Sequence, residues 1–171
     1  MKPIKFAIIG GDGRNIALAK ILKAHGHTVR LFGFSFYEKN YEKENLETCK
    51  NLYEAVDGAD YIIGPTPLSY NGHIMNTVLN DREINIEDLF KIMNPKQIFF
   101  AGYIKDEAIK SAGKYETRII DLLKREELLV LNAIPTALQI GDNKKPTIIA
   151  VNIICKPLPV FYGNFTKQNF A

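Results

Sequence analysis

The chain of 171 residues contains no long hydrophobic run. None of its apolar stretches approaches the roughly 18–20 residues that a helix needs to cross a bilayer. Its first residues, Met1-Lys2-Pro3, lead almost directly into an expected strand and carry no signal-peptide hydrophobic core. We therefore expect no membrane partner.

Cysteine is scarce. The two cysteines, Cys49 and Cys155, lie far apart in the sequence and belong to no CxxC or zinc-ligand spacing. This pattern predicts neither a disulfide framework nor a metal site. It makes a reduced, cytoplasmic setting the default expectation.

An excess of one sign of charge is also missing from most of the chain. The net charge of +3 arises after Gly141, where four lysines face the single acid Asp142. The preceding residues are balanced, so no basic face is expected and nucleic acid is not indicated as a partner. Hydrophobic residues make up 46% and charged residues 24% of the 171 positions, which suits one globular domain with or without an appendage.

The most informative stretch that is present runs from Lys5 to Arg14, with the sequence KFAIIGGDGR. Phe6–Ile9 has the composition of a strand that is buried on both faces. Three glycines follow in a turn, and from Arg14 apolar residues recur with helical spacing. A strand, a glycine turn and a helix open many nucleotide-binding α/β folds, and the start of such a helix favours an anion.

The match to the dinucleotide fingerprint GxGxxG is poor. Ile16 stands where the fingerprint needs glycine or alanine, and no carboxylate follows the expected strand Thr28–Phe32 before Glu38. Asp12 would also place a negative charge beside a pyrophosphate. We therefore do not favour dinucleotide binding at this turn, and we expect Asp12 to cap the helix that follows it.

Strand and helix patterns alternate along the rest of the chain. Further strands are expected at 61–63, 97–101 and 117–121, with helices at 52–56, at 86–93 and within 104–117, where a break is expected near Gly113. The stretches 37–51 and 68–82 are predicted to be largely loops. This alternation predicts a flavodoxin/Rossmann-like, doubly wound parallel sheet of the α/β class.

In such sheets ligands bind outside the carboxyl ends of the strands. Four segments rich in glycine, proline or small polar residues are expected there: Gly10–Arg14, Gly64–Ser69, Gly102–Tyr103 and Asn132–Thr136. Only the first of them carries a fixed positive charge at a helix start. We expect the ligand site at this edge, and the candidate binding residues are Gly10, Gly11, Asp12, Gly13, Arg14, Pro65, Thr66, Gly102, Asn132, Pro135 and Thr136.

Taken together, these segments resemble the N-terminal domain family of the dipicolinate synthase A subunit. The matching pieces are IIGGDGR (8–14), AHGHTVRLFGF (24–34), DYIIGPTPLS (60–69), FFAGYI (99–104) and DLLKREELLVLNAIPTA (121–137). The resemblance covers about residues 4–137. It implies a domain that helps to hold the substrate, next to a separate Rossmann domain that binds the nicotinamide cofactor.

The reaction that the resemblance implies is the NAD(P)-linked oxidation of dihydrodipicolinate to dipicolinate, the calcium-chelating diacid of spores. A small dicarboxylate is then the expected ligand, the dipicolinate synthase B subunit is a candidate partner, and the mother cell of a sporulating bacterium is the expected location. NAD(P) is the cofactor of the family, but none is expected to bind this chain alone.

The sequence departs from the family after Ala137, where members continue with Glu-Gly and a long helix. We therefore divide the chain into a family-like domain, 1–137, and a divergent tail, 138–171, which has the character of a truncation or a changed reading frame. The alternative is a genuine terminal strand over 147–154, which has good β propensity. With no second glycine fingerprint, the chain alone is not expected to be an active enzyme.

Several roles stay open from the sequence. Arg14 either binds a substrate carboxylate through its planar guanidinium or pairs with Asp12. Thr66, Thr136 and Asn132 are either ligand-binding or loop-stabilising, and His73 is best interpreted as a surface histidine. The competing functions are a free-standing nucleotide- or anion-binding module and a non-catalytic remnant.

Overall fold

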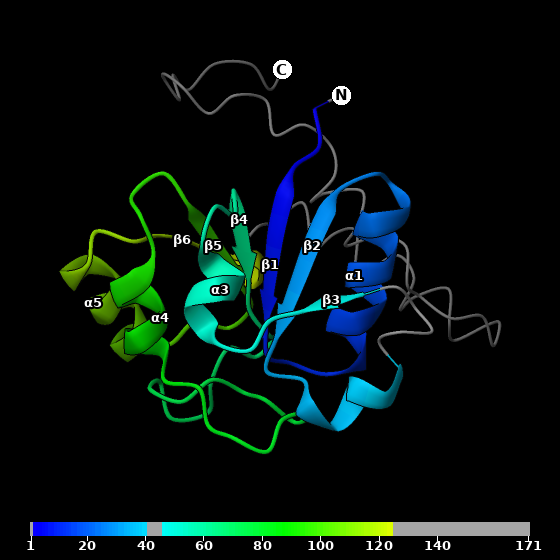
Figure 1. Cartoon of the computed structure of the whole chain (residues 1–171). Helices are drawn as coiled ribbons and strands as arrows, with labels where there is room; N and C mark the ends of the chain where they lie inside the picture. Colours follow the sequence, from blue (N-terminus) through cyan, green and yellow to red (C-terminus); the bar gives the residue numbers. More distant parts are fainter. Residues whose placement is uncertain (1, 41–45, 125–171) are drawn as a thin grey trace, which may run out of the picture.

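A computed structural model describes residues 2–40 and 46–124 of the chain. Its centre is one sheet in which every strand is parallel to its neighbours (Figure 1). The strand order is β3-β2-β1-β4-β5-β6. The strands are β1 (Lys5–Ile9), β2 (Thr28–Phe32), β3 (Glu47–Thr48), β4 (Tyr61–Ile63), β5 (Ile98–Ala101) and β6 (Arg118–Asp121).

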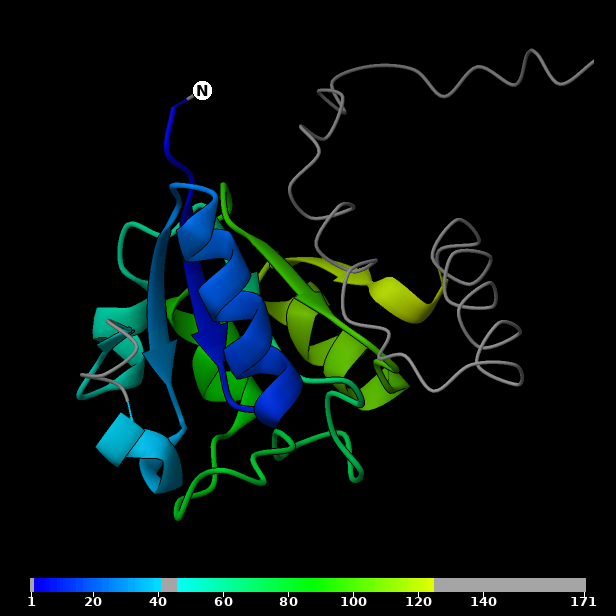
Figure 2. The same ribbon diagram turned by 90° about the vertical axis from the view of Figure 1, so that its right-hand side faces the viewer.

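Helices cover both faces of the sheet. The α-helices are α1 (Gly13–Ala24), α3 (Leu52–Val56), α4 (Ile86–Ile92) and α5 (Asp106–Lys114), and the short 3-10 helices are η1 (Ser35–Asn40) and η2 (Leu122–Lys124). The longest helix, α1, lies on one face, whereas α3, α4 and α5 lie on the other (Figures 1 and 2). No helix in this described part of the chain is long and apolar enough to cross a membrane.

The predicted fold class is confirmed. Without the two-residue β3, the remaining strands follow the order of flavodoxin, and β3 extends that order to the Rossmann arrangement. The chain moves outward from β1 to β2 and β3, and then returns to β4 on the other side of β1. The carboxyl ends of β1 and β4 therefore form the switch point at which ligands bind in folds of this type.

Alternation along β1 divides the core into two layers. Phe6 and Ile8 pack in the cluster that contains residues of α1, whereas Ala7 and Ile9 pack in the cluster that contains residues of α3, α4 and α5. All four side chains are at most 1% exposed. Because successive side chains of a strand point to opposite faces, this run of apolar residues needs helices on both sides.

Both ends of α1 are capped. Asp12 is the N-cap, as expected, and it forms a capping box with Asn15. At the other end His25 is the C-cap and Gly26 follows it, at the position where glycine commonly ends a helix. Gly26 has φ +82°, and the N–H groups of Gly26 and His27 donate to the carbonyls of Lys23 and Leu22 in a Schellman motif.

Gly33 holds the end of β2 against two other parts of the ligand-binding edge. Its φ is +86°, and a Cβ at this position would lie 2.6 Å from Ile84 Cδ1 and 3.2 Å from the backbone nitrogen of Gly10. No side chain fits this gap without displacing the turn after β1 or the segment that contains Ile84. Glycine is therefore required for both its backbone conformation and its size.

Replacing Gly33 by alanine is expected to destabilise the fold by about 1–3 kcal/mol, because strain at positive φ adds to the clash with backbone. Chemical denaturation of the purified variant measures this loss. Gly113→Ala is the matched control, because Gly113 lies in α5 with open space where the Cβ would be, so alanine should stabilise by about 0.5–1 kcal/mol. Equal stabilities for the two variants would contradict the packing argument.

Candidate functional site

Three of the four segments predicted at the ligand-binding edge are in contact. Arg14 Nη2 donates to the carbonyl of Thr66 at 2.6 Å, which joins the start of α1 to the loop after β4. The N–H of Gly102 donates to the carbonyl of Pro65 at 3.2 Å, which joins that loop to the end of β5. The candidates Asn132, Pro135 and Thr136 lie outside the described residues, so their place at this edge stays a prediction.

Arg14 is paired with Asp12. Its Nη2 lies 2.7 Å from Asp12 Oδ2, and its Nε donates to Oδ1 at 3.0 Å. This hydrogen bonding lowers the pKa of the Asp12 carboxyl and raises the pKa of the Arg14 guanidinium above their ordinary values. The sequence left two roles open for Arg14, carboxylate binding and pairing with Asp12. The structure contains the pair with Asp12, so Arg14 is not the unpaired cation that a purely ligand-binding role would need.

The pair leaves part of the guanidinium available. The Arg14 side chain is 70% exposed, and its Nη1 has no hydrogen-bond partner among the described residues. The ion pair also neutralises Asp12, the negative charge that would otherwise repel an anion at the helix start. Arg14 can therefore fasten two loops and still donate one group toward a ligand.

The glycine turn presents free backbone donors. Within residues 2–40 and 46–124, no hydrogen bond is formed by the N–H groups of Gly11 and Gly13. Open space lies where a Cβ of Gly13 would be. Gly10 is closely covered instead, because a Cβ there would lie 2.6 Å from Thr77 Cγ2 and 3.1 Å from Met75 Sδ. A small anion has access to the start of α1 at the exposed Gly13, whereas Gly11 is buried against the Asn15 side chain and Gly10 is covered by Thr77 and Met75.

Two polar residues of this edge were missed by the sequence argument. Asn15 is 8% exposed, and its side chain accepts from the N–H of Asp12 and donates to the carbonyl of Gly64, both at 3.4 Å. The Asp121 carboxylate accepts from the N–H groups of Tyr103 and Ile104 at 3.0 Å. Because the loop after β5 uses these amides internally, they are not available to a ligand.

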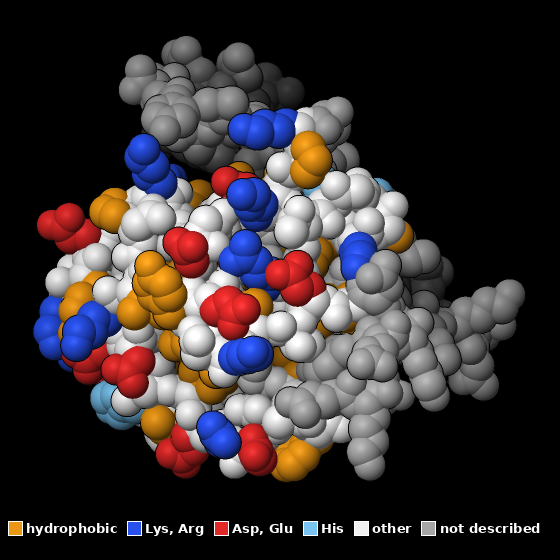
Figure 3. Space-filling view, in the orientation of Figure 1, with side chains coloured by type: hydrophobic (Ala, Val, Ile, Leu, Met, Phe, Trp, Pro, Cys, Tyr) orange, Lys and Arg blue, Asp and Glu red, His pale blue; other side chains and the backbone are white. Residues whose placement is uncertain are grey.

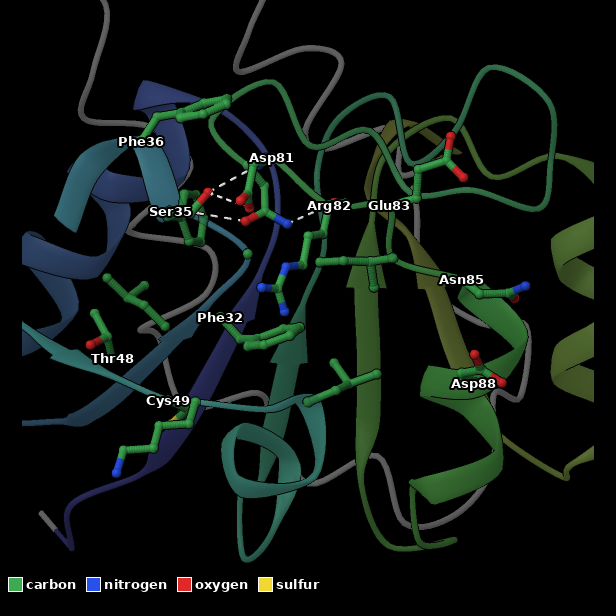
Figure 4. Close-up of a pocket in the computed structure, with 17 residues that line it drawn as sticks. Phe32, Ser35, Phe36, Thr48, Cys49, Asp81, Arg82, Glu83, Asn85 and Asp88 are labelled. Atoms are coloured by element: carbon green, nitrogen blue, oxygen red, sulfur yellow. Dashed lines mark hydrogen bonds between the residues drawn. The ribbon is translucent and has the colours of Figure 1, made fainter.

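A hollow beside this edge was not predicted. A cavity of about 800 Å³ opens at the carboxyl ends of β2 and β3, facing the segment 80–85 and the first turn of α4 (Figure 4). None of the sequence-predicted site residues lines it. Cys49 does line it, but burial raises the pKa of this thiol to about 11, so the thiolate nucleophile is scarce at neutral pH.

Neither a metal cluster nor a basic face emerges from this geometry. The described segments contain no group of three or more His, Cys, Asp or Glu residues placed to hold a metal ion. In the view of Figure 3, side chains of both charges are interspersed, with no area of a single sign.

The comparison with protein-family models decides the family. Residues 5–123 match the model that describes the N-terminal domain of the dipicolinate synthase A subunit. The chain belongs to this family. The resemblance inferred from the five sequence segments is thus confirmed, and the glycine turn with its neighbouring loops is the carboxyl edge of a dipicolinate synthase A-type N-terminal domain.

The relatives are longer than this chain. The dipicolinate synthase A subunit of Bacillus subtilis (strain 168) is 22% identical over 137 residues, which cover 78% of this chain and 44% of the relative. The crystal structure of the same B. subtilis protein superposes with a TM-score of 0.68 at 22% identity, over 85% of this chain and 50% of that one. The A subunit from Bacillus halodurans gives 0.66 at 18% identity, over 82% and 50%. The chain thus spans about half the length of these relatives.

Arg14→Ala is expected to lower the free energy of unfolding by about 0.5–1.5 kcal/mol, because the exposed pair with Asp12 and the bond to the Thr66 carbonyl are both lost. Arg14→Lys should recover little of this, since an ammonium cannot reproduce the forked contact. Arg118→Ala, which removes an exposed cation at the amino end of β6, is the control and should be neutral. Unchanged stability of Arg14→Ala would show that the loop contact contributes nothing.

The ion pair also predicts a pH dependence. Because the pKa of Asp12 is lower in the folded chain, its contribution is present above the unfolded value of about 4 and is lost as the pH falls through the folded value. Asp12→Asn keeps a capping side chain without the charge. The wild type should therefore exceed this variant in stability by about 0.2–1 kcal/mol near neutral pH, with the difference vanishing in acid. Urea titrations from neutral to acidic pH measure it, and a constant difference would refute the assignment.

Proposed function

We propose that this chain is the substrate-binding domain of a dipicolinate synthase A-type oxidoreductase, acting in the formation of dipicolinate during sporulation. In the proposed reaction dihydrodipicolinate loses a hydride to NAD(P)+ and a proton, which gives dipicolinate and NAD(P)H. The observation that carries the proposal is the N–H group of the exposed Gly13, which has no hydrogen-bond partner within the described residues, in a chain that belongs to this family.

The edge suits one carboxylate of such a diacid. The N–H groups of Gly11 and Gly13 stand at the start of a 12-residue helix, where the helix dipole adds a partial positive charge. Arg14 Nη1 can add a charged donor, and the Asp12 carboxylate is already neutralised by Arg14 Nε and Nη2. Thr66 and Gly102 form the neighbouring wall, since a Cβ at Gly102 would lie 2.5 Å from the Thr66 hydroxyl.

NAD(P), which supplies the hydride acceptor of the proposed reaction, does not suit this turn. Ile16 replaces the third residue of the fingerprint, and no carboxylate that could bind the ribose follows β2 before Glu38. The cofactor is therefore assigned to the part of the relatives that this chain does not span. The chain alone is then expected to bind substrate without turning it over. The cytoplasm of the mother cell, as the location, and the dipicolinate synthase B subunit, as the partner, belong to the same proposal.

A free-standing anion-binding module is the second candidate. The same exposed helix start at Gly13 favours it, because backbone donors at a helix start bind phosphate as readily as carboxylate. The two functions differ in ligand preference. A diacid-binding domain selects pyridine-2,6-dicarboxylate, whereas a general module responds equally to inorganic phosphate or to ATP.

Binding of pyridine-2,6-dicarboxylate is expected to stabilise the chain, by about 2.7 kcal/mol at 100 times its Kd. Thermal unfolding with this diacid, inorganic phosphate, ATP and NAD(P) compares the ligands directly. Arg14→Ala should weaken diacid binding about ten- to a hundredfold, the scale of a hydrogen bond to a charged group. Arg118→Ala should leave it unchanged. No stabilisation by the diacid would refute the proposal.

A double variant separates two ways in which Arg14 could act. Arg14→Ala alone removes a donor and also exposes the charge of Asp12 to the ligand. Asp12→Asn combined with Arg14→Ala removes the donor without leaving that charge. If affinity returns in the double variant, Arg14 serves by neutralising Asp12; if affinity stays low, Arg14 contacts the ligand.

A further inference from the structure

The cavity beside β2 and β3 has walls from several parts of the chain. Phe32 and Gly33 come from the end of β2, Thr48 and Cys49 from β3 and the residue after it, and Arg82 and Asn85 from the segment that leads into α4. The volume of about 800 Å³ lies within the range of small-molecule sites. The cavity shares no lining residue with the glycine turn, so it is a separate place on the molecule.

The segment that carries Arg82 is held in place on both sides. Ser35 Oγ donates to Asp81 Oδ1 at 2.8 Å and accepts from the N–H of Asp81 at 2.9 Å. Asn80 Nδ2 donates to the carbonyl of Arg82 itself at 2.7 Å. These contacts, drawn as dashed lines in Figure 4, tie the segment to the start of η1. Ile84, which is 4% exposed, anchors it to the core.

The guanidinium of Arg82 points into the cavity toward the ring of Phe32 (Figure 4). It has no hydrogen bond or ion pair within the described residues. The nearby acids do not compensate it, because the Asp81 carboxylate is engaged by Ser35 and the Glu83 carboxylate points away from the cavity. The Asp88 carboxylate lies beside Asn85 on α4. The planar guanidinium of Arg82 thus faces the ring of Phe32, and within the described residues its N–H groups have no acceptor.

We infer that this cavity binds a small monocarboxylate with a flat apolar body. The carboxylate pairs with the guanidinium of Arg82, because two parallel N–H donors match its two oxygens, and the body lies against Phe32. Carboxylates also line the cavity, and they repel a dianionic phosphate more strongly than a ligand with a single carboxylate. This inference does not depend on the function proposed for the glycine turn.

Benzoate is the probe. Acetate, which keeps the carboxylate, and benzamide, which keeps the ring, are the control ligands. In two-dimensional NMR of the full chain, benzoate is expected to give saturable shifts at the amides of Phe32, Ser35 and Thr48. Acetate, which lacks the body, and benzamide, which lacks the charge, should bind at least about tenfold more weakly. Inorganic phosphate should not displace benzoate.

Variants assign the contacts. Arg82→Gln should weaken benzoate binding about ten- to a hundredfold, Arg82→Lys should restore only part of it, and Phe32→Leu should weaken it by a smaller factor. Arg118→Gln is the matched control, because it removes one exposed cation at the opposite edge of the sheet, and it should bind benzoate as the wild type does.

Three results would overturn the inference. The first is the absence of saturable shifts at millimolar benzoate in a wild type whose spectrum is that of a folded protein. The second is equal affinity of Arg82→Gln and Arg118→Gln for benzoate. The third is a set of shifts confined to Gly10–Arg14, which would leave the function proposed for that turn intact. Arg82 is exposed, so its variants should fold, and their melting temperatures confirm this independently.

Discussion

The carboxyl edge of the sheet depends on how the chain connects the segments that follow β1 and β4. The two strands are neighbours, yet their following segments diverge, and the bond from Arg14 to the Thr66 carbonyl spans that divergence. The ion pair with Asp12 holds the guanidinium in the orientation that this bond needs. Asn15 makes a second, buried link from the same helical turn to Gly64. The position of the open glycine amides follows from these contacts.

Much of the fold could be predicted because its signals are local. The buried run Phe6–Ile9, the glycine turn and the cap at Asp12 each depend on neighbours within a few residues, and the structure contains all three. The parallel sheet followed from the alternation of strand and helix patterns, whereas the order of its strands was not predicted. Because the carboxyl ends of parallel strands share one edge of the sheet, the turn of Gly10–Arg14 was placed at the same edge as the loop after β4, and the two are in contact.

The parts that could not be predicted depend on contacts between distant residues. Asp121 has the local pattern of a strand end, and only the pairing of β6 with β5 brings its carboxylate to the amides of Tyr103 and Ile104. Arg82 is one charge in a polar loop of the sequence, and the backbone around it is held by hydrogen bonds from the N–H of Asp81 to Ser35 Oγ and from Asn80 Nδ2 to the carbonyl of Arg82. Pairing with Asp12 was only one of the options for Arg14, because spacing alone does not decide between a side-chain partner and a ligand.

Asp12 combines several tasks in one carboxylate. It accepts from the N–H of Arg14 as the cap of α1, and it accepts from Nε and Nη2 of the same residue as an ion pair. Substitutions at Asp12 and Arg14 are therefore epistatic, because each changes the background in which the other acts. During evolution the two positions are therefore expected to covary, and a change at either is better tolerated when the other changes with it.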